Sequence, residues 1–155
     1  MALIGDWDLG DDNNTVYKEK LADSSVENLY MVRDLGSCFG SGRLTWPLGR
    51  SRGNVNTYRQ SRFITKAEQG YVDFYTPSAP ALYFLATPRE YRKKLRLRWI
   101  GRHIPRDDAR WSGQLLARLS PSQIRDAFRS ADYSPEDIEA FAQIVERRIR
   151  QLVAL

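Results

Sequence analysis

Cysteine and histidine are almost absent from this chain of 155 residues, which has only Cys38 and His103. One Cys excludes an intrachain disulfide and a zinc site of several thiolates, and one His excludes a His-rich metal site. A serine hydrolase is also disfavoured, because no Gly-x-Ser-x-Gly sequence accompanies the lone His. A metal ion held by this chain would therefore take oxygen ligands.

Long apolar runs are lacking as well. The longest, residues 79–86, contains Pro80 and is too short to cross a bilayer. The first four residues carry no basic side chain and run into Asp6 and Asp8, unlike a signal peptide. We therefore expect a cytoplasmic protein with no membrane partner. An apolar content of 42% predicts that the chain folds, and its length suits a single domain.

The N-terminal half has the pattern of a hairpin followed by irregular chain. Residues 15–18 and 29–33 favour strands, and residues 19–28 favour a polar connection between them. A Gly-rich loop follows at 36–42, the chain to Gln60 shows no clear period, and residues 71–75 indicate a short strand.

The C-terminal third favours three helices. The first, over 107–118, places Trp111, Leu115 and Leu119 on one face. The second begins at a capping box formed by Ser120 and Gln123, and the third begins after Ser134. The predicted fold class is α+β: a short β-hairpin with catalytic and metal-binding loops, an irregular middle, and a C-terminal three-helix cluster.

The most informative motif is the order of three polar side chains around the predicted hairpin. Asp8 and Asn13 lie five residues apart before the hairpin, and Asp34 follows it beside Leu35 and Gly36. Phosphoryl transfer needs a carboxylate near the attacking hydroxyl and oxygen ligands that hold magnesium against nucleotide phosphates. A hairpin that joins Asn13 to Asp34 would bring these loop ends together.

This order resembles the C-terminal, large lobe of the protein-kinase-like superfamily. The sequence Gly5-Asp6-Trp7-Asp8, with Asn13-Asn14 after it, looks closer to the atypical bacterial branches, such as the spore-coat kinase family. The resemblance covers residues 5–40. It implies that Asp8 is the catalytic base, that Asn13 is a magnesium ligand, and that Asp34 is the metal-binding Asp, so that Asn13 and Asp34 hold the cofactors Mg²⁺ and ATP.

The chain departs from the family at several positions. Asp6 stands where protein kinases have a His, Gly10 where they usually have a Lys, and Leu35 where they have a Phe. No Gly-rich nucleotide loop and no Lys precede Asp8. We therefore expect residues 1–155 to be the C-terminal part of a larger kinase-like domain, inactive until an upstream nucleotide-binding lobe completes it.

The acidic loop, defined as residues 6–14, has two other interpretations that its sequence can test. Clusters of Asp, Asn and Gly are common in turns, where their side chains cap backbone N–H groups, and this structural role remains an alternative. A calcium-binding EF-hand is rejected, because counting from Asp6 puts Gly10 at the fifth place and Tyr17 at the twelfth, where oxygen ligands are required.

A second candidate site is the basic strip, defined as residues 89–106. It contains eight basic residues and one acid, with Tyr91 and Trp99 among them. Such a strip suits the phosphates and bases of a nucleic acid, with Arg92, Lys93 and Arg96 as contacts, or an acidic substrate. The alternative is a solvated face of a core element.

The leading prediction is a phosphotransferase that acts on an unknown acceptor; the runners-up are a nucleic-acid-binding module and a pseudokinase used for protein contacts.

Overall fold

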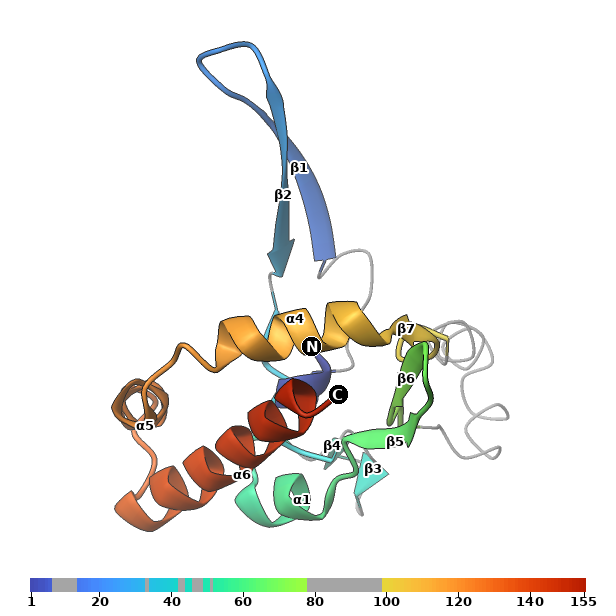
Figure 1. The fold of residues 1–155 in the computed structure, drawn as a ribbon. Coiled ribbons are helices and arrows are strands. Elements are labelled where there is room, and N and C mark those ends of the chain that lie inside the picture. Colours follow the sequence, from blue (N-terminus) through green and yellow to red (C-terminus); the bar gives the residue numbers. More distant parts are fainter. Residues whose placement is uncertain (7–13, 33, 42–43, 46–48, 51, 78–98) are drawn as a thin grey trace, which may run out of the picture.

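The computed structural model describes residues 1–6, 14–32, 34–41, 44–45, 49–50, 52–77 and 99–155 (Figure 1). It is a mixed α+β fold with small antiparallel sheets and helices at the C-terminal end. Its elements are a 3-10 helix η1 (Ala2–Ile4), the strands β1 (Asn14–Lys20), β2 (Val26–Val32), β3 (Leu44–Thr45), β4 (Gly49–Arg50), β5 (Ile64–Ala67), β6 (Tyr71–Phe74) and β7 (Ile104–Pro105), and the helices α1 (Val55–Gln60), α4 (Arg106–Leu116), α5 (Pro121–Arg129) and α6 (Pro135–Val153).

The predicted hairpin is confirmed, and it is longer than expected. β1 and β2 pair from Asn14 opposite Val32 to Lys20 opposite Val26. Half of the segment predicted as a polar connection, 19–28, is therefore strand, which corrects that prediction. The turn is closed by the Asp23 carboxylate, which accepts a hydrogen bond of 2.9 Å from the Ser25 N–H. In Figure 1 the hairpin projects away from the helical body.

The middle of the chain is more regular than expected. The helix α1 is capped by Asn54, whose side chain accepts from the Thr57 N–H and so satisfies a first-turn donor. The strands β5, β6 and β7 form an antiparallel sheet in that order. The strand predicted at 71–75 is confirmed as β6, whereas the prediction of irregular chain up to Gln60 was wrong at α1 and at the short β3–β4 pair.

The three predicted C-terminal helices are present as α4, α5 and α6. The capping box at Ser120 and Gln123 is formed as expected. However, the three residues predicted to share a buried face, Trp111 and Leu115 on α4 and Leu119 beyond its end, are exposed, and Trp111 is 62% accessible. The buried face is that of Ala109 and Gly113, because α4 packs closely against α6.

The core contains an aromatic cluster between α1, α5 and α6. Phe128 and Phe141 are stacked with ring centroids 4.9 Å apart, and the buried Tyr58 lies 5.9 Å from Phe141. A second group of buried side chains joins the sheet to α4 and the end of α6. Together these contacts anchor the N-terminal segment that leads into the acidic loop.

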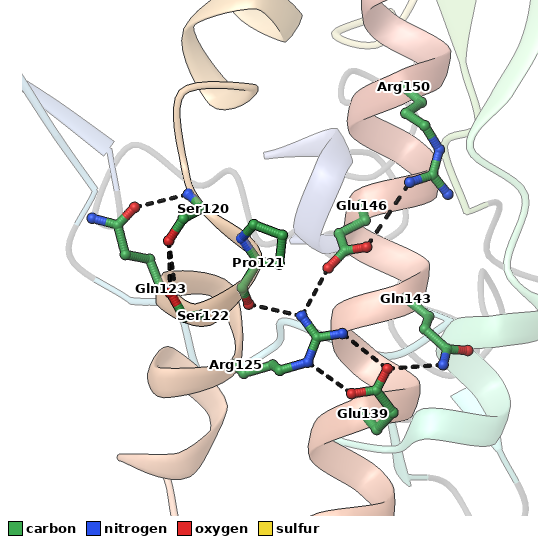
Figure 2. A network of polar contacts seen from close by, with 9 residues as sticks. All are labelled: Ser120, Pro121, Ser122, Gln123, Arg125, Glu139, Gln143, Glu146 and Arg150. Atoms are coloured by element: carbon green, nitrogen blue, oxygen red, sulfur yellow. Dashed lines mark hydrogen bonds and ion pairs between the residues drawn. The ribbon is translucent and has the colours of Figure 1, made fainter.

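An ionic network fastens α5 to α6 on the protein surface (Figure 2). The Arg125 guanidinium donates to both carboxylate oxygens of Glu139, at 2.7 and 2.9 Å, and to Glu146 at 3.0 Å. These bonds lower the pKa of Glu139 to about 2, since Arg125 favours the charged carboxylate. The bidentate geometry fixes the relative position of the two helices.

No helix within the described ranges is long and apolar enough to cross a membrane.

Candidate functional site

Asp34 lies at the base of the hairpin, two residues after the end of β2, and is exposed to solvent. Its Oδ1 atom accepts a hydrogen bond of 2.7 Å from the Gly36 N–H. A Cβ atom on Gly36 would lie 2.9 Å from the same oxygen, closer than real Cβ contacts allow. Gly36 therefore lets the backbone wrap around the carboxylate, which orients Asp34 while leaving it at the surface.

Asp6 is the fully buried acid beside this turn. Its Oδ1 atom accepts a hydrogen bond of 2.7 Å from the Ser37 hydroxyl. The neighbouring Cys38 is also buried; desolvation, together with the charge and hydrogen bond of Asp6, raises the pKa of its thiol to about 12. Asp6 thus ties the entrance of the acidic loop to the segment that follows Asp34.

Phe39 fixes this segment to the body. Its N–H donates to the Ile4 carbonyl at 2.7 Å, and its own carbonyl accepts from the Asn54 N–H at 2.9 Å. Its ring lies 5.0 Å from that of Phe128 in the core. The φ of Phe39 is 57°, a left-handed value that is rare for a bulky residue, so the surrounding contacts must hold it there.

Arg148 supports the same region from α6. It is buried, and it donates to the carbonyls of Leu3 at 2.9 Å, Tyr58 at 3.2 Å and Ser61 at 3.2 Å, and to the Ser61 hydroxyl at 2.6 Å. Its guanidinium lies over two aromatic rings, 4.1 Å from the Tyr58 centroid and 5.1 Å from that of Phe63. Burial lowers the pKa of Arg148 and raises that of Tyr58 to about 12.

The predicted site residues are only partly described. Asp34 is placed as above; the other candidates, Asp8, Asn13, Arg92, Lys93 and Arg96, lie outside the described residues. The register nevertheless puts Asn14, the residue after Asn13, opposite Val32, close to Asp34 in the chain. Among the described residues, no group of three or more His, Cys, Asp or Glu side chains gathers to hold a metal ion.

The sequence alone did not predict the structural roles of Asp6, Phe39 and Arg148. The burial of Arg148 could have been predicted, because it lies three and four residues after Val145 and Ile144, within the apolar stripe of α6. No local pattern pointed to the other two, whose neighbours come from distant parts of the chain.

The described end of the basic strip divides into structural and exposed residues. Arg106 donates to the carbonyls of Glu68, at 3.0 Å, and of Leu155, so it is used in packing. His103 stacks on Tyr71 with ring centroids 4.5 Å apart. Trp99 is 69% exposed, and the guanidinium of Arg102 lies 5.8 Å from its ring.

Comparison of the chain with protein-family models, with curated proteins and with solved structures finds no match. The residues of the chain itself therefore carry the functional inference.

Proposed function

We propose that this chain carries the catalytic base and the metal ligands of a kinase-like phosphotransferase. The enzyme would transfer phosphate from Mg²⁺-ATP once an upstream lobe binds the nucleotide. In this proposal Asp8 accepts the proton of the attacking hydroxyl, and Asn13 and Asp34 hold the magnesium ion. The observation that carries it is the hairpin register, in which Asn14 pairs with Val32. The two loops that bear the expected ligands thus start from the same end of one hairpin.

The surroundings of Asp34 fit a magnesium ligand. Magnesium in nucleotide sites is usually bound by one or two carboxylates together with waters and substrate phosphates, so a cluster of three acids is not required. Asp34 is exposed, and its hydrogen bond from Gly36 fixes the direction of the carboxylate. When bound, the ion would neutralise charge on the phosphates and align them for transfer.

Asp6 and Ser37 support the proposal by coupling the two loops. Asp6 is two residues before Asp8, and Ser37 is three residues after Asp34. Their hydrogen bond of 2.7 Å is partly buried and joins the chain on both sides of the hairpin. Such a bond would hold the base and the metal ligand in a constant relative position, which phosphoryl transfer demands.

Titration of Mn²⁺, a spectroscopic substitute for magnesium, tests the metal side of the proposal. We expect one ion per chain in electron paramagnetic resonance, and Asp34→Asn should weaken its binding by at least about 10-fold. Asp108→Asn is the matched control, since Asp108 is an exposed acid in the first turn of α4. Equal binding by wild type and Asp34→Asn would refute the assignment of Asp34.

Nucleic-acid binding through the basic strip is the second candidate. Exposed Trp99 with Arg102 beside it favours this function, because an exposed aromatic ring next to a cation can stack on a base. Replacement of Arg92, Lys93 and Arg96 by Ala should abolish salt-sensitive binding of single-stranded RNA or DNA oligonucleotides. Metal binding without phosphate transfer, in a chain that includes the upstream lobe, would favour the pseudokinase instead.

A further inference from the structure

The β1–β2 hairpin exposes apolar side chains on both faces. Residues alternate between the faces of a strand, and directly paired residues share a face, so the register assigns every position. Val16 and Val26, on one face, are 54% and 60% exposed; Leu29 and Met31, on the other, are 44% and 42% exposed. The lysine face comprises Val16, Lys18, Lys20, Val26, Asn28 and Tyr30, and the glutamate face comprises Thr15, Tyr17, Glu19, Glu27, Leu29 and Met31.

The position of the hairpin makes both faces accessible to a partner. It forms a sheet of its own and projects beyond α4, away from the helical body (Figure 1). A two-stranded hairpin is at best marginally stable in water when neither face is covered. Exposed apolar side chains that continue along both strands are typical of an interaction surface.

The charges of the two faces indicate what the partner is. The lysine face carries Lys18 and Lys20 and no acid, whereas the glutamate face has Glu19 directly opposite Glu27 and no base. Like charges directly opposite one another destabilise a strand pair, so a positive surface laid over these glutamates would offset their repulsion. The hairpin itself offers such a surface, on its other face.

We propose that the hairpin is a self-association arm, in which the lysine face of one copy covers the glutamate face of a second copy. With the two hairpins pointing in opposite directions, overlapping near their tips and with the sheets about 10 Å apart, β1 of one copy would lie over β2 of the other, and the helical bodies would stand at opposite ends. Lys18 and Lys20 of one copy would then lie over Glu27 of the other, and Val26 would lie over Tyr17. The contact joins two different faces, so further copies can add and the assembly can exceed a dimer. This proposal does not depend on phosphate transfer.

A charge-swap experiment tests the arm in the full chain. Sedimentation velocity over a range of concentrations should show that wild type associates, and that association weakens as salt rises from about 0.05 M to about 1 M. Lys18→Glu with Lys20→Glu makes both faces acidic, and Glu19→Lys with Glu27→Lys makes both basic. Each double variant should associate at least about 30-fold more weakly, because like charges then meet.

Mixing the two double variants gives the sharpest result. Each acidic face then finds a basic one, so the mixture should recover the association that either variant lacks alone. The control is Arg62→Glu with Arg118→Glu, which makes the same charge change as the lysine double variant at exposed positions off the hairpin and should associate like wild type. If a double variant loses its helical circular dichroism, the single reversals Lys18→Glu and Glu27→Lys replace it.

Three results would overturn the proposal. Wild type could remain monomeric at every concentration, which would assign the hairpin to a different chain or to a preceding segment. The double variants could associate as wild type does, or their mixture could remain monomeric. Either of the last two would show that the charges of the two faces do not meet in the assembly.

Discussion

Replacement of Arg148 by Met should destabilise the fold strongly. The guanidinium bonds three main-chain carbonyls and one hydroxyl from η1, α1 and the residue after α1. Two of those carbonyls keep a second donor, because Leu3 also accepts from the Tyr58 hydroxyl at 2.5 Å and Tyr58 accepts from the Ser61 hydroxyl at 2.7 Å. The main loss is therefore the bonds to Ser61 and the contacts with the two rings.

The size of the effect follows from these contacts. An unsatisfied buried carbonyl costs about 1–3 kcal/mol, and a desolvated cation over an aromatic ring contributes about 2 kcal/mol. Met carries no charge, so the variant avoids the desolvation cost of a buried cation, and this offsets part of the loss in stability. We expect Arg148→Met to lower the free energy of unfolding by about 2–4 kcal/mol, a large share of a typical total of about 5–15 kcal/mol. The free energy of unfolding of Arg148→Lys should lie between those of wild type and Arg148→Met, since an ammonium cannot span the same carbonyls.

Urea unfolding followed by circular dichroism measures this loss. The midpoint should fall while the slope with denaturant stays constant, as expected when stability changes without a change in the unfolded state. Arg147→Met is the matched control, because Arg147 is next to Arg148 on α6 but is exposed. A change below about 0.5 kcal/mol in Arg148→Met would refute the claim that this side chain holds η1 against the body.

Three further predictions concern other parts of the fold. Gly113→Ala should lower the free energy of unfolding by about 1–3 kcal/mol despite the better helix propensity of Ala, because its Cβ would lie 2.5 Å from that of Leu152 on α6. Gly70→Ala, with open space around it, should be tolerated in the same unfolding assay. The pKa of Glu139 is about 2 in the fold against an ordinary 4.5, so its stabilisation by Arg125 is present above pH 4.5 and lost as pH falls to about 2; the stability difference between wild type and Glu139→Gln should shrink over that interval. Cys38, whose thiol pKa is about 12, should react with iodoacetamide at pH about 8 only as the chain unfolds, and rapid labelling of the native chain would contradict its burial.

Local signals in the sequence were sufficient for the hairpin and the C-terminal helices. Ser120, Ser134 and the following prolines mark helix starts that need no tertiary information. The full extent of β1 and β2 was missed because a hairpin exposed on both faces has no buried face to impose alternation. The helix α1 was missed because six residues are too few for a period to show.

The interpretation of helix faces and of the site needed the tertiary structure. Trp111 has the spacing of a core residue, but Gly113 on another face permits a closer approach of α4 to α6, and that packing decides which face is buried. The order of Asp8, Asn13 and Asp34 suggested one site, and that site stays a prediction, because Asp8 and Asn13 lie outside the described residues. The partly buried hydrogen bond between Ser37 and Asp6 joins residues 31 positions apart, which no local pattern reveals.

The central claim is that this chain carries the base and the metal ligands for phosphoryl transfer. The most direct test measures transfer of labelled phosphate from ATP by the chain together with the upstream lobe that the proposal requires, in the presence of magnesium. We predict transfer by wild type and by Asp108→Asn, and loss of at least about 100-fold in Asp8→Asn and in Asp34→Asn, because each removes a group that acts at the reacting phosphate. Transfer that persists at the wild-type rate in both Asp8→Asn and Asp34→Asn would contradict the account.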